Sequence, residues 1–106
     1  MKTDRELLEL SAKAAGYKLH IWGTEGAENV ARMDTLSPTK WNPITDDGDA
    51  LRLAVKLDIT LYQYGHEVSA CNERGTVNES VEKVGDPHAA TRRAIVRAAV
   101  AIGEAM

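Results

Sequence analysis

The chain has 106 residues, and at this length we expect a single domain over residues 1–106. Hydrophobic residues make up 43% and charged residues 27%, a composition that excludes global disorder. The formal net charge of −3 argues against nucleic acid as the main partner, because such binding depends on Lys and Arg side chains that neutralise phosphates. With one cysteine, no secretion signal and no apolar run approaching about 20 residues, the chain is expected in the cytoplasm rather than in a membrane.

The N-terminal segment predicts a helix over Thr3–Ala15. Thr3 and Glu6 have the spacing of a capping box, in which each side chain bonds a backbone N–H at the start of the helix. Gly16 is a typical residue just after the last turn, because glycine adopts the left-handed conformation at little cost.

Alternation of large apolar and polar residues predicts a strand over Tyr17–Trp22. Lys18, His20 and Trp22 would share one face of this strand. After a turn rich in glycine, Val30–Met33 is expected to form the return strand of a hairpin.

A turn around Pro43 precedes a helix predicted over Asp47–Leu57. Proline fixes its own φ and favours an extended conformation at Asn42. Asp46 is a good N-cap, and Asp49 follows at the spacing of a capping box. The apolar residues expected to form the buried face of this helix are Leu51, Leu53, Ala54, Val55 and Leu57.

Three further strands and a long helix complete the predicted elements. The strands are expected over Ile59–Tyr64, Glu67–Cys71 and Thr76–Val84, with a hairpin turn at Asn72–Gly75. Asp86 and Pro87 are typical of a helix start, and this helix should run over Pro87–Ile102 and end at Gly103. The small side chains that would let it approach a sheet closely are Ala90, Ala94, Ala98 and Ala101.

The order of these elements predicts the α+β class. We expect a three- to five-stranded, largely antiparallel sheet packed with two or three helices.

Three blocks of the sequence carry a resemblance to a known family. They are Lys2–Leu8, Trp41–Ala54 with its Trp-Asn-Pro and Asp-Asp-Gly-Asp motifs, and Ala89–Ala99. Together they resemble the phage α-β-α (ABA) sandwich domain, a family of small phage and prophage proteins. The resemblance implies an ABA-sandwich-like fold and a bacterial host cell, and it implies no assigned reaction. Gly23–Lys40 is longer than the family pattern, so an inserted hairpin or loop is expected there.

The acidic cluster Asp46, Asp47 and Asp49 has two interpretations. Carboxylates at short spacing suit Ca²⁺ or Mg²⁺, but a calcium loop needs ligands over about twelve positions, and here an apolar helix follows. We therefore interpret the cluster as a helix cap and expect no metal and no cofactor. The histidines are far apart, no nucleophile or phosphate-binding motif is present, and Cys71 is expected to be a buried, inert thiol, so no catalytic residue is predicted.

Several side chains are candidates for binding. Trp22 and His20 share a strand face and could contact a partner. Arg92, Arg93 and Arg97 could bind an anion or an acidic partner, or could form a solvated helix face paired with the acids near Asp46.

The motif Trp41-Asn42-Pro43 is expected to be structural, with Trp41 in the core beside the second helix.

These observations favour a non-enzymatic phage accessory protein that binds a host protein, such as an inhibitor of a bacterial defence system with an anti-CRISPR-like role. The alternative is a small-ligand binder that sequesters a nucleotide-derived immune signal, with the arginines and tryptophans converging on one pocket. Homo-oligomerisation is left open.

Overall fold

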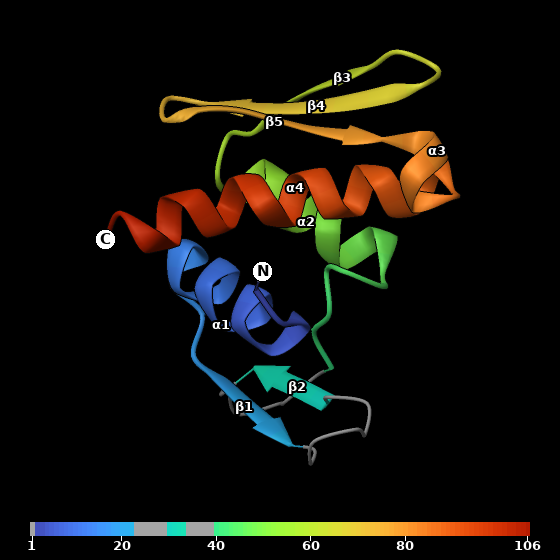
Figure 1. Ribbon diagram of the computed structural model, residues 1–106. Helices are drawn as coiled ribbons and strands as arrows, with labels where there is room; N and C mark the ends of the chain where they lie inside the picture. Colours follow the sequence, from blue (N-terminus) through green and yellow to red (C-terminus); the bar gives the residue numbers. More distant parts are fainter. Residues whose placement is uncertain (1, 23–29, 34–39) are drawn as a thin grey trace.

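The computed structural model describes residues 2–22, 30–33 and 40–106 (Figure 1). These residues form an α+β fold, as the sequence predicts. The elements are α1 (Asp4–Ala15), β1 (Leu19–Trp22), β2 (Val30–Met33), α2 (Asp47–Lys56), β3 (Thr60–Gln63), β4 (Glu67–Asn72), β5 (Gly75–Ser80), α3 (Val81–Val84) and α4 (Pro87–Glu104).

Strands β3, β4 and β5 form one antiparallel sheet in the order β3-β4-β5. Helix α4 runs along one face of this sheet (Figure 1). The contact is made by small side chains, because Ala90, Ala94 and Ala98 of α4 are buried against Val68 and Ala70 of β4. These three alanines let the helix approach the strands, as the sequence pattern predicted, but Ala101, the fourth residue of the predicted face, is exposed.

The opposite side of α4 packs on α1 and α2, and here the large apolar side chains gather. Trp41 is only 2% exposed and meets the ring of Tyr17 edge-on, with the ring centres 5.7 Å apart. Its burial confirms the prediction that Trp41 lies in the core, and the structural role of the Trp-Asn-Pro motif stays a prediction. Leu8 and Leu53 complete the centre of this core.

Strands β1 and β2 form a separate two-stranded antiparallel ribbon on the far side of α1 (Figure 1). The predicted return strand over Val30–Met33 is therefore confirmed. The inserted loop expected on either side of it lies outside the described residues.

Most of the predicted helix ends are confirmed. Thr3 and Glu6 form a complete capping box, and Gly16 ends α1 in the left-handed region with φ 77°. Asp46 accepts a hydrogen bond from the Asp49 N–H at 2.8 Å and caps α2. The Asp49 carboxylate does not return to Asp46, however, and accepts from the Asn42 N–H at 2.9 Å instead. It thereby fixes the Asn-Pro turn against the start of the helix.

The predicted buried face of α2 is partly wrong. Leu53 and Ala54 are buried, but Leu51 and Val55 are 59% and 70% exposed. The apolar residues of this helix cover more of its circumference than α4 and α1 can bury. Ala50, which the prediction left out, takes a buried place instead.

Two other predicted boundaries are also wrong. The strand expected over Thr76–Val84 ends at Ser80, whose hydroxyl accepts from the Lys83 N–H and begins the short helix α3. Gly103 does not end α4, which continues to Glu104. Gly103 is buried where α1 crosses α4, and a methyl group there would overlap the carbonyl oxygen of Leu10. This glycine permits close helix packing rather than a stop.

Candidate functional site

The face of the three-stranded sheet that points away from α4 has no covering element in the described part of the chain (Figure 1). Strand register defines its residues, because alternate residues point to the same side. We call this surface the outer face, and it comprises Thr60, Tyr62, Tyr64, Glu67, Ser69, Cys71, Thr76, Asn78 and Ser80.

Two tyrosines dominate the outer face. Tyr62 and Tyr64 are 48% and 52% exposed, and their rings stack at an interplanar angle of 11° with centres 6.5 Å apart. Exposed aromatic rings held in a fixed orientation lose little entropy when a partner covers them.

The rest of the outer face is made of small polar side chains that bond to one another across the strands. Ser69 donates to the Asn78 side-chain oxygen at 2.6 Å, and Cys71 Sγ lies 3.3 Å from Thr76 Oγ1. The thiol is half-buried on this face, so the expectation of a fully buried Cys71 is wrong.

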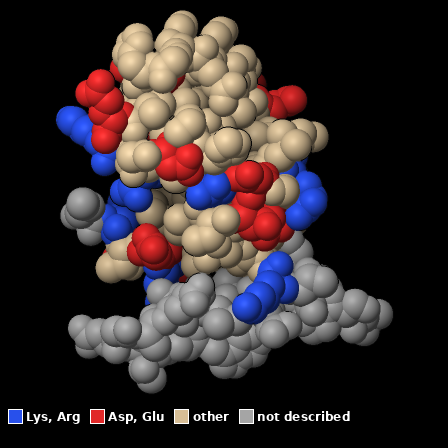
Figure 2. Space-filling view, turned by 90° about the vertical axis from the view of Figure 1, so that its right-hand side faces the viewer, with Lys and Arg blue, Asp and Glu red and all other residues tan. Residues whose placement is uncertain are grey.

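Charge is scarce at the sheet end of the molecule. Figure 2 shows acidic and basic side chains gathered over the helical part, whereas most of the surface at the sheet end is neither. On the outer face itself Glu67 is the one charged residue, and it is half-buried at the end of β4. A partner can therefore cover this face without desolvating many charges.

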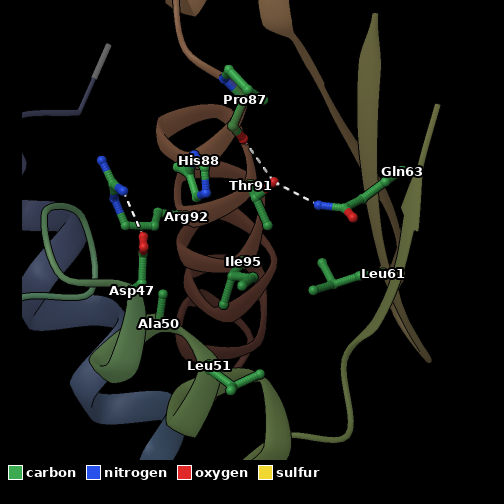
Figure 3. A pocket seen from close by; sticks show the side chains of 10 residues that line it. All are labelled: Asp47, Ala50, Leu51, Leu61, Gln63, Pro87, His88, Thr91, Arg92 and Ile95. Carbon is green, nitrogen blue, oxygen red and sulfur yellow. Dashed lines mark hydrogen bonds and ion pairs between the residues drawn. The ribbon is translucent and has the colours of Figure 1, made fainter. Parts of the chain in front are cut away.

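A groove lies beside β3, between this strand and helices α2 and α4 (Figure 3). Its volume is about 380 Å³, and we call it the α2–β3 groove. Its lining residues are Asp47, Ala50, Leu51, Leu61, Gln63, Pro87, His88, Thr91, Arg92 and Ile95.

The polar groups of the groove are mostly bonded to one another. Gln63 Nε2 donates to Thr91 Oγ1 at 3.1 Å, and the Thr91 hydroxyl donates to the Pro87 carbonyl at 2.8 Å (Figure 3). Next to them, Asp86 accepts hydrogen bonds from the backbone of Ala89 and His88. The bond from Ala89 is the main reason that the pKa of Asp86 lies below its usual range.

The three candidate arginines do not converge on one site. Arg92 is 17% exposed and donates to Asp47 at 2.6 Å and to the Ile44 carbonyl at 2.8 Å. Arg93 and Arg97 both contact Glu79, at 3.5 Å and 2.6 Å. Each of the three is thus paired within the chain, but only Arg92 pairs with an acid near Asp46, and the partner of Arg93 and Arg97 is Glu79 of β5 instead.

Arg92 has a structural task that the sequence did not reveal. By holding both Asp47 and the Ile44 carbonyl, it ties the Asn-Pro turn and the start of α2 to α4. Pairing with the acids near Asp46 was one of the two interpretations of the arginines, but no local signal indicated the bond to the Ile44 carbonyl, because Ile44 and Arg92 are 48 residues apart in sequence.

His20 and Trp22 lie in β1, opposite Arg32 and Val30 of β2. The structure describes their backbone but not their side chains, so their role stays a prediction. The ribbon that carries them is on the far side of α1 from the outer face (Figure 1).

The acidic cluster at the start of α2 is divided among separate partners. Asp46 caps the helix, Asp47 binds Arg92, and Asp49 binds the Asn42 N–H and Arg52. The hydrogen bond to Asp49 raises the pKa of Arg52. Among the described residues, no three His, Cys, Asp or Glu side chains gather in a way that could hold a metal ion.

Sequence reasoning missed four exposed apolar and aromatic residues of α2 and of the segment that contains β3: Leu51, Val55, Tyr62 and Tyr64. The alternation in β3 did place both tyrosines on one face of a strand. Which face of the sheet α4 would cover depends on tertiary packing, so the pattern alone could not show that this face is open.

Comparisons with known proteins give no indication of what these features do. No family model, curated protein or solved structure matches the chain. The resemblance to the phage α-β-α sandwich family therefore stays a prediction. No helix in the described part of the chain has the length and apolar character needed to cross a membrane.

Proposed function

We propose that this protein is a non-enzymatic binding module that docks a protein of the bacterial host cell on the outer face of its sheet. The observation that carries the proposal is the stacked, half-exposed pair Tyr62 and Tyr64 on an uncovered sheet face with little charge. Tyrosine is among the residues that supply most of the binding energy in protein interfaces.

The biological setting of this proposal rests on the resemblance to small phage proteins. In that setting the partner is a component of host defence, and binding would block it in an anti-CRISPR-like manner. Two features support a protein as the partner rather than nucleic acid. The outer face offers no Lys or Arg for phosphates, and its one charged residue, Glu67, is acidic.

The second candidate is a small anionic ligand in the α2–β3 groove, where Arg92 and His88 are lining residues. This candidate is weaker, because Asp47 lies 2.6 Å from Arg92 and neutralises the guanidinium that an anion would need.

Affinity capture from host lysate, with mass spectrometry of both proteins and small molecules, tests the proposal. We expect the parent chain to enrich a host protein and Tyr64→Ser to lose it. Met106→Ser is the matched control, since Met106 is 65% exposed but belongs to the C-terminal end. If the double change Tyr62→Ser and Tyr64→Ser captures the same protein as the parent, the outer face is not the docking site. Enrichment of a small anion that is lost in Arg92→Met would favour the second candidate.

A further inference from the structure

Strand β3 is an edge of the sheet, and its outward backbone groups have no partner strand in the described part of the chain. The Tyr64 N–H donates to the Glu67 carbonyl at 2.8 Å. Hydrogen-bonded pairs alternate along antiparallel strands, so the backbone groups of Tyr62 also point toward β4. Those of Leu61 and Gln63 must therefore point away from the sheet.

Natural sheets usually protect such an edge with charged residues, proline or a bulge. The segment Thr60–Tyr64 contains no charged residue and no proline, and its pairing with β4 is regular. The opposite edge differs, because Glu79 of β5 holds Arg93 and Arg97. Arg97 also donates to the Asn78 carbonyl of β5, so within this three-stranded sheet the β3 edge is the one left ready to pair.

Apolar surface flanks this edge on both sides. Leu51 and Val55 of α2 are exposed below it, and Tyr62 and Tyr64 are exposed above it. These four side chains alone expose roughly 500 Å² per chain, against about 800 Å² per partner in a standard stable interface. The backbone of β3 and the lining of the α2–β3 groove add to this area.

We infer that the occupant of this edge is a second copy of the same chain, with the two β3 strands antiparallel about a two-fold axis. A two-fold axis makes the contact self-complementary and closed, so that it ends at a dimer. The two sheets then form one sheet of six strands, and the uncharged edge meets an identical uncharged edge.

The register of this pairing follows from which backbone groups are free. The Ile59 N–H already bonds the Ala54 carbonyl, and Gly65 begins the turn to β4. Only Leu61 and Gln63 can bond outward, so Leu61 pairs with the partner's Gln63 and Gln63 with the partner's Leu61. Tyr62 then lies directly opposite the partner's Tyr62 on the outer face.

This arrangement goes beyond the proposed function and does not depend on it. It joins the two outer faces, so that the tyrosines of both copies form one row across the dimer. The dimer forms whether or not a host protein binds to that row.

Two charge substitutions distinguish this specific pairing from a general effect of removing an exposed tyrosine. Tyr62→Glu would place two carboxylates opposite each other at the axis, and we expect it to weaken dimerisation by at least about tenfold. Tyr64→Glu is the matched control, because its opposite residue is the partner's Thr60. Sedimentation velocity over a concentration series measures both, with circular dichroism to verify that each variant folds.

A disulfide tests the register independently of affinity. Residues directly opposite in a non-hydrogen-bonded pair have Cα atoms about 4.5 Å apart, which is within disulfide range. Tyr62→Cys in a Cys71→Ser background should therefore oxidise to a covalent dimer. Tyr64→Cys in the same background should not, since four residues of offset separate the two copies by about 13 Å.

The inference is overturned if the parent sediments as an 11.6 kDa monomer throughout the micromolar range. It is also overturned if Tyr62→Glu and Tyr64→Glu dimerise alike, or if Tyr64→Cys cross-links as readily as Tyr62→Cys. A dimer that persists while host-protein capture fails would reject the proposed function and leave the pairing supported.

Discussion

The two sides of α4 are built from different residues. Toward α1 and α2 it buries large side chains, with Trp41, Leu8 and Leu53 at the centre. Toward the sheet it presents Ala90, Ala94 and Ala98, and the sheet keeps its other face open. Burial of apolar area is what stabilises the fold, so most of the stability should reside on the first side. The second side holds the three-stranded sheet in place. The outer face of this sheet is available for contacts.

Among the changes that test this difference, truncation of Trp41 should cause the largest loss of stability. Trp41→Ala removes the largest buried side chain and should lower the free energy of unfolding by about 3–5 kcal/mol. Denaturant unfolding measures the loss. Tyr64→Ala is the control and should unfold close to the parent. A loss below about 1 kcal/mol for Trp41→Ala would mean that the two sides of α4 contribute alike.

Loss of Arg92 should have the next largest effect, because its contacts join α2 to α4. Arg92→Met keeps the aliphatic stem but leaves Asp47 and the Ile44 carbonyl without their donor, and we expect a cost of about 1–3 kcal/mol. Arg93→Met is the matched control, since Glu79 retains Arg97. Equal melting temperatures for the two variants would show that the Arg92 contacts are not stabilising.

The sheet side should respond to added volume rather than to removed volume. Ala94→Leu inserts a larger side chain where α4 lies close to the strands, and overpacking of this kind typically costs about 1–3 kcal/mol. Ala101→Leu, on an exposed part of the same helix, should be neutral. If Ala94→Leu melts like Ala101→Leu, the helix and the sheet are not closely packed.

The N-cap of α2, on the side of α4 that packs on α1 and α2, should make a smaller contribution to the free energy of unfolding. Asp46→Ala leaves the Asp49 N–H without its side-chain acceptor and should cost about 0.5–2 kcal/mol. Thr45→Ala, at the exposed neighbouring position, is the control. The thermal midpoints of the two variants should differ, and identical midpoints would contradict a capping role.

The smallest effect is expected from the charge of Asp86 at the start of α4. Its pKa is lowered from the usual 3.8 by backbone hydrogen bonds, mainly from Ala89, so the ionised form favours the folded state. That contribution is present above the unfolded-state pKa and is lost as the pH falls through the lower folded-state value. The stability difference between the parent and Asp86→Asn should therefore persist at neutral pH and shrink below about pH 4. A difference that does not vary with pH would contradict this origin.

The sequence predicted most of the elements because their signals are local. Thr3 with Glu6, Asp46 and Pro87 each act on backbone groups within one turn, so their spacing suffices to place a helix start. Distant contacts were not predictable in this way. Whether Leu51 is buried depends on how much of α2 the neighbouring helices can cover, and the bond from Arg92 to the Ile44 carbonyl joins residues 48 positions apart.

The candidate site shows the same limit. The alternation in β3 placed Tyr62 and Tyr64 on one side of a strand, but burial of the other side depends on α4, which follows more than 20 residues later. Trp22 drew attention as an aromatic in a strand, and Arg93 and Arg97 as neighbouring charges. Neither signal indicates whether a side chain already has a partner within the fold.

Helix α4 contributes residues to both apolar clusters, including Ile95 and Val96 to one and Ala90 and Ala98 to the other. During translation, therefore, neither cluster can close before this helix has left the ribosome. A nascent chain that ends before Pro87 has the hairpins and the first two helices but lacks the helix that joins both clusters. Folding of this protein should follow release of α4 from the exit tunnel, and the uncharged strand β3 would be exposed to chaperones until then.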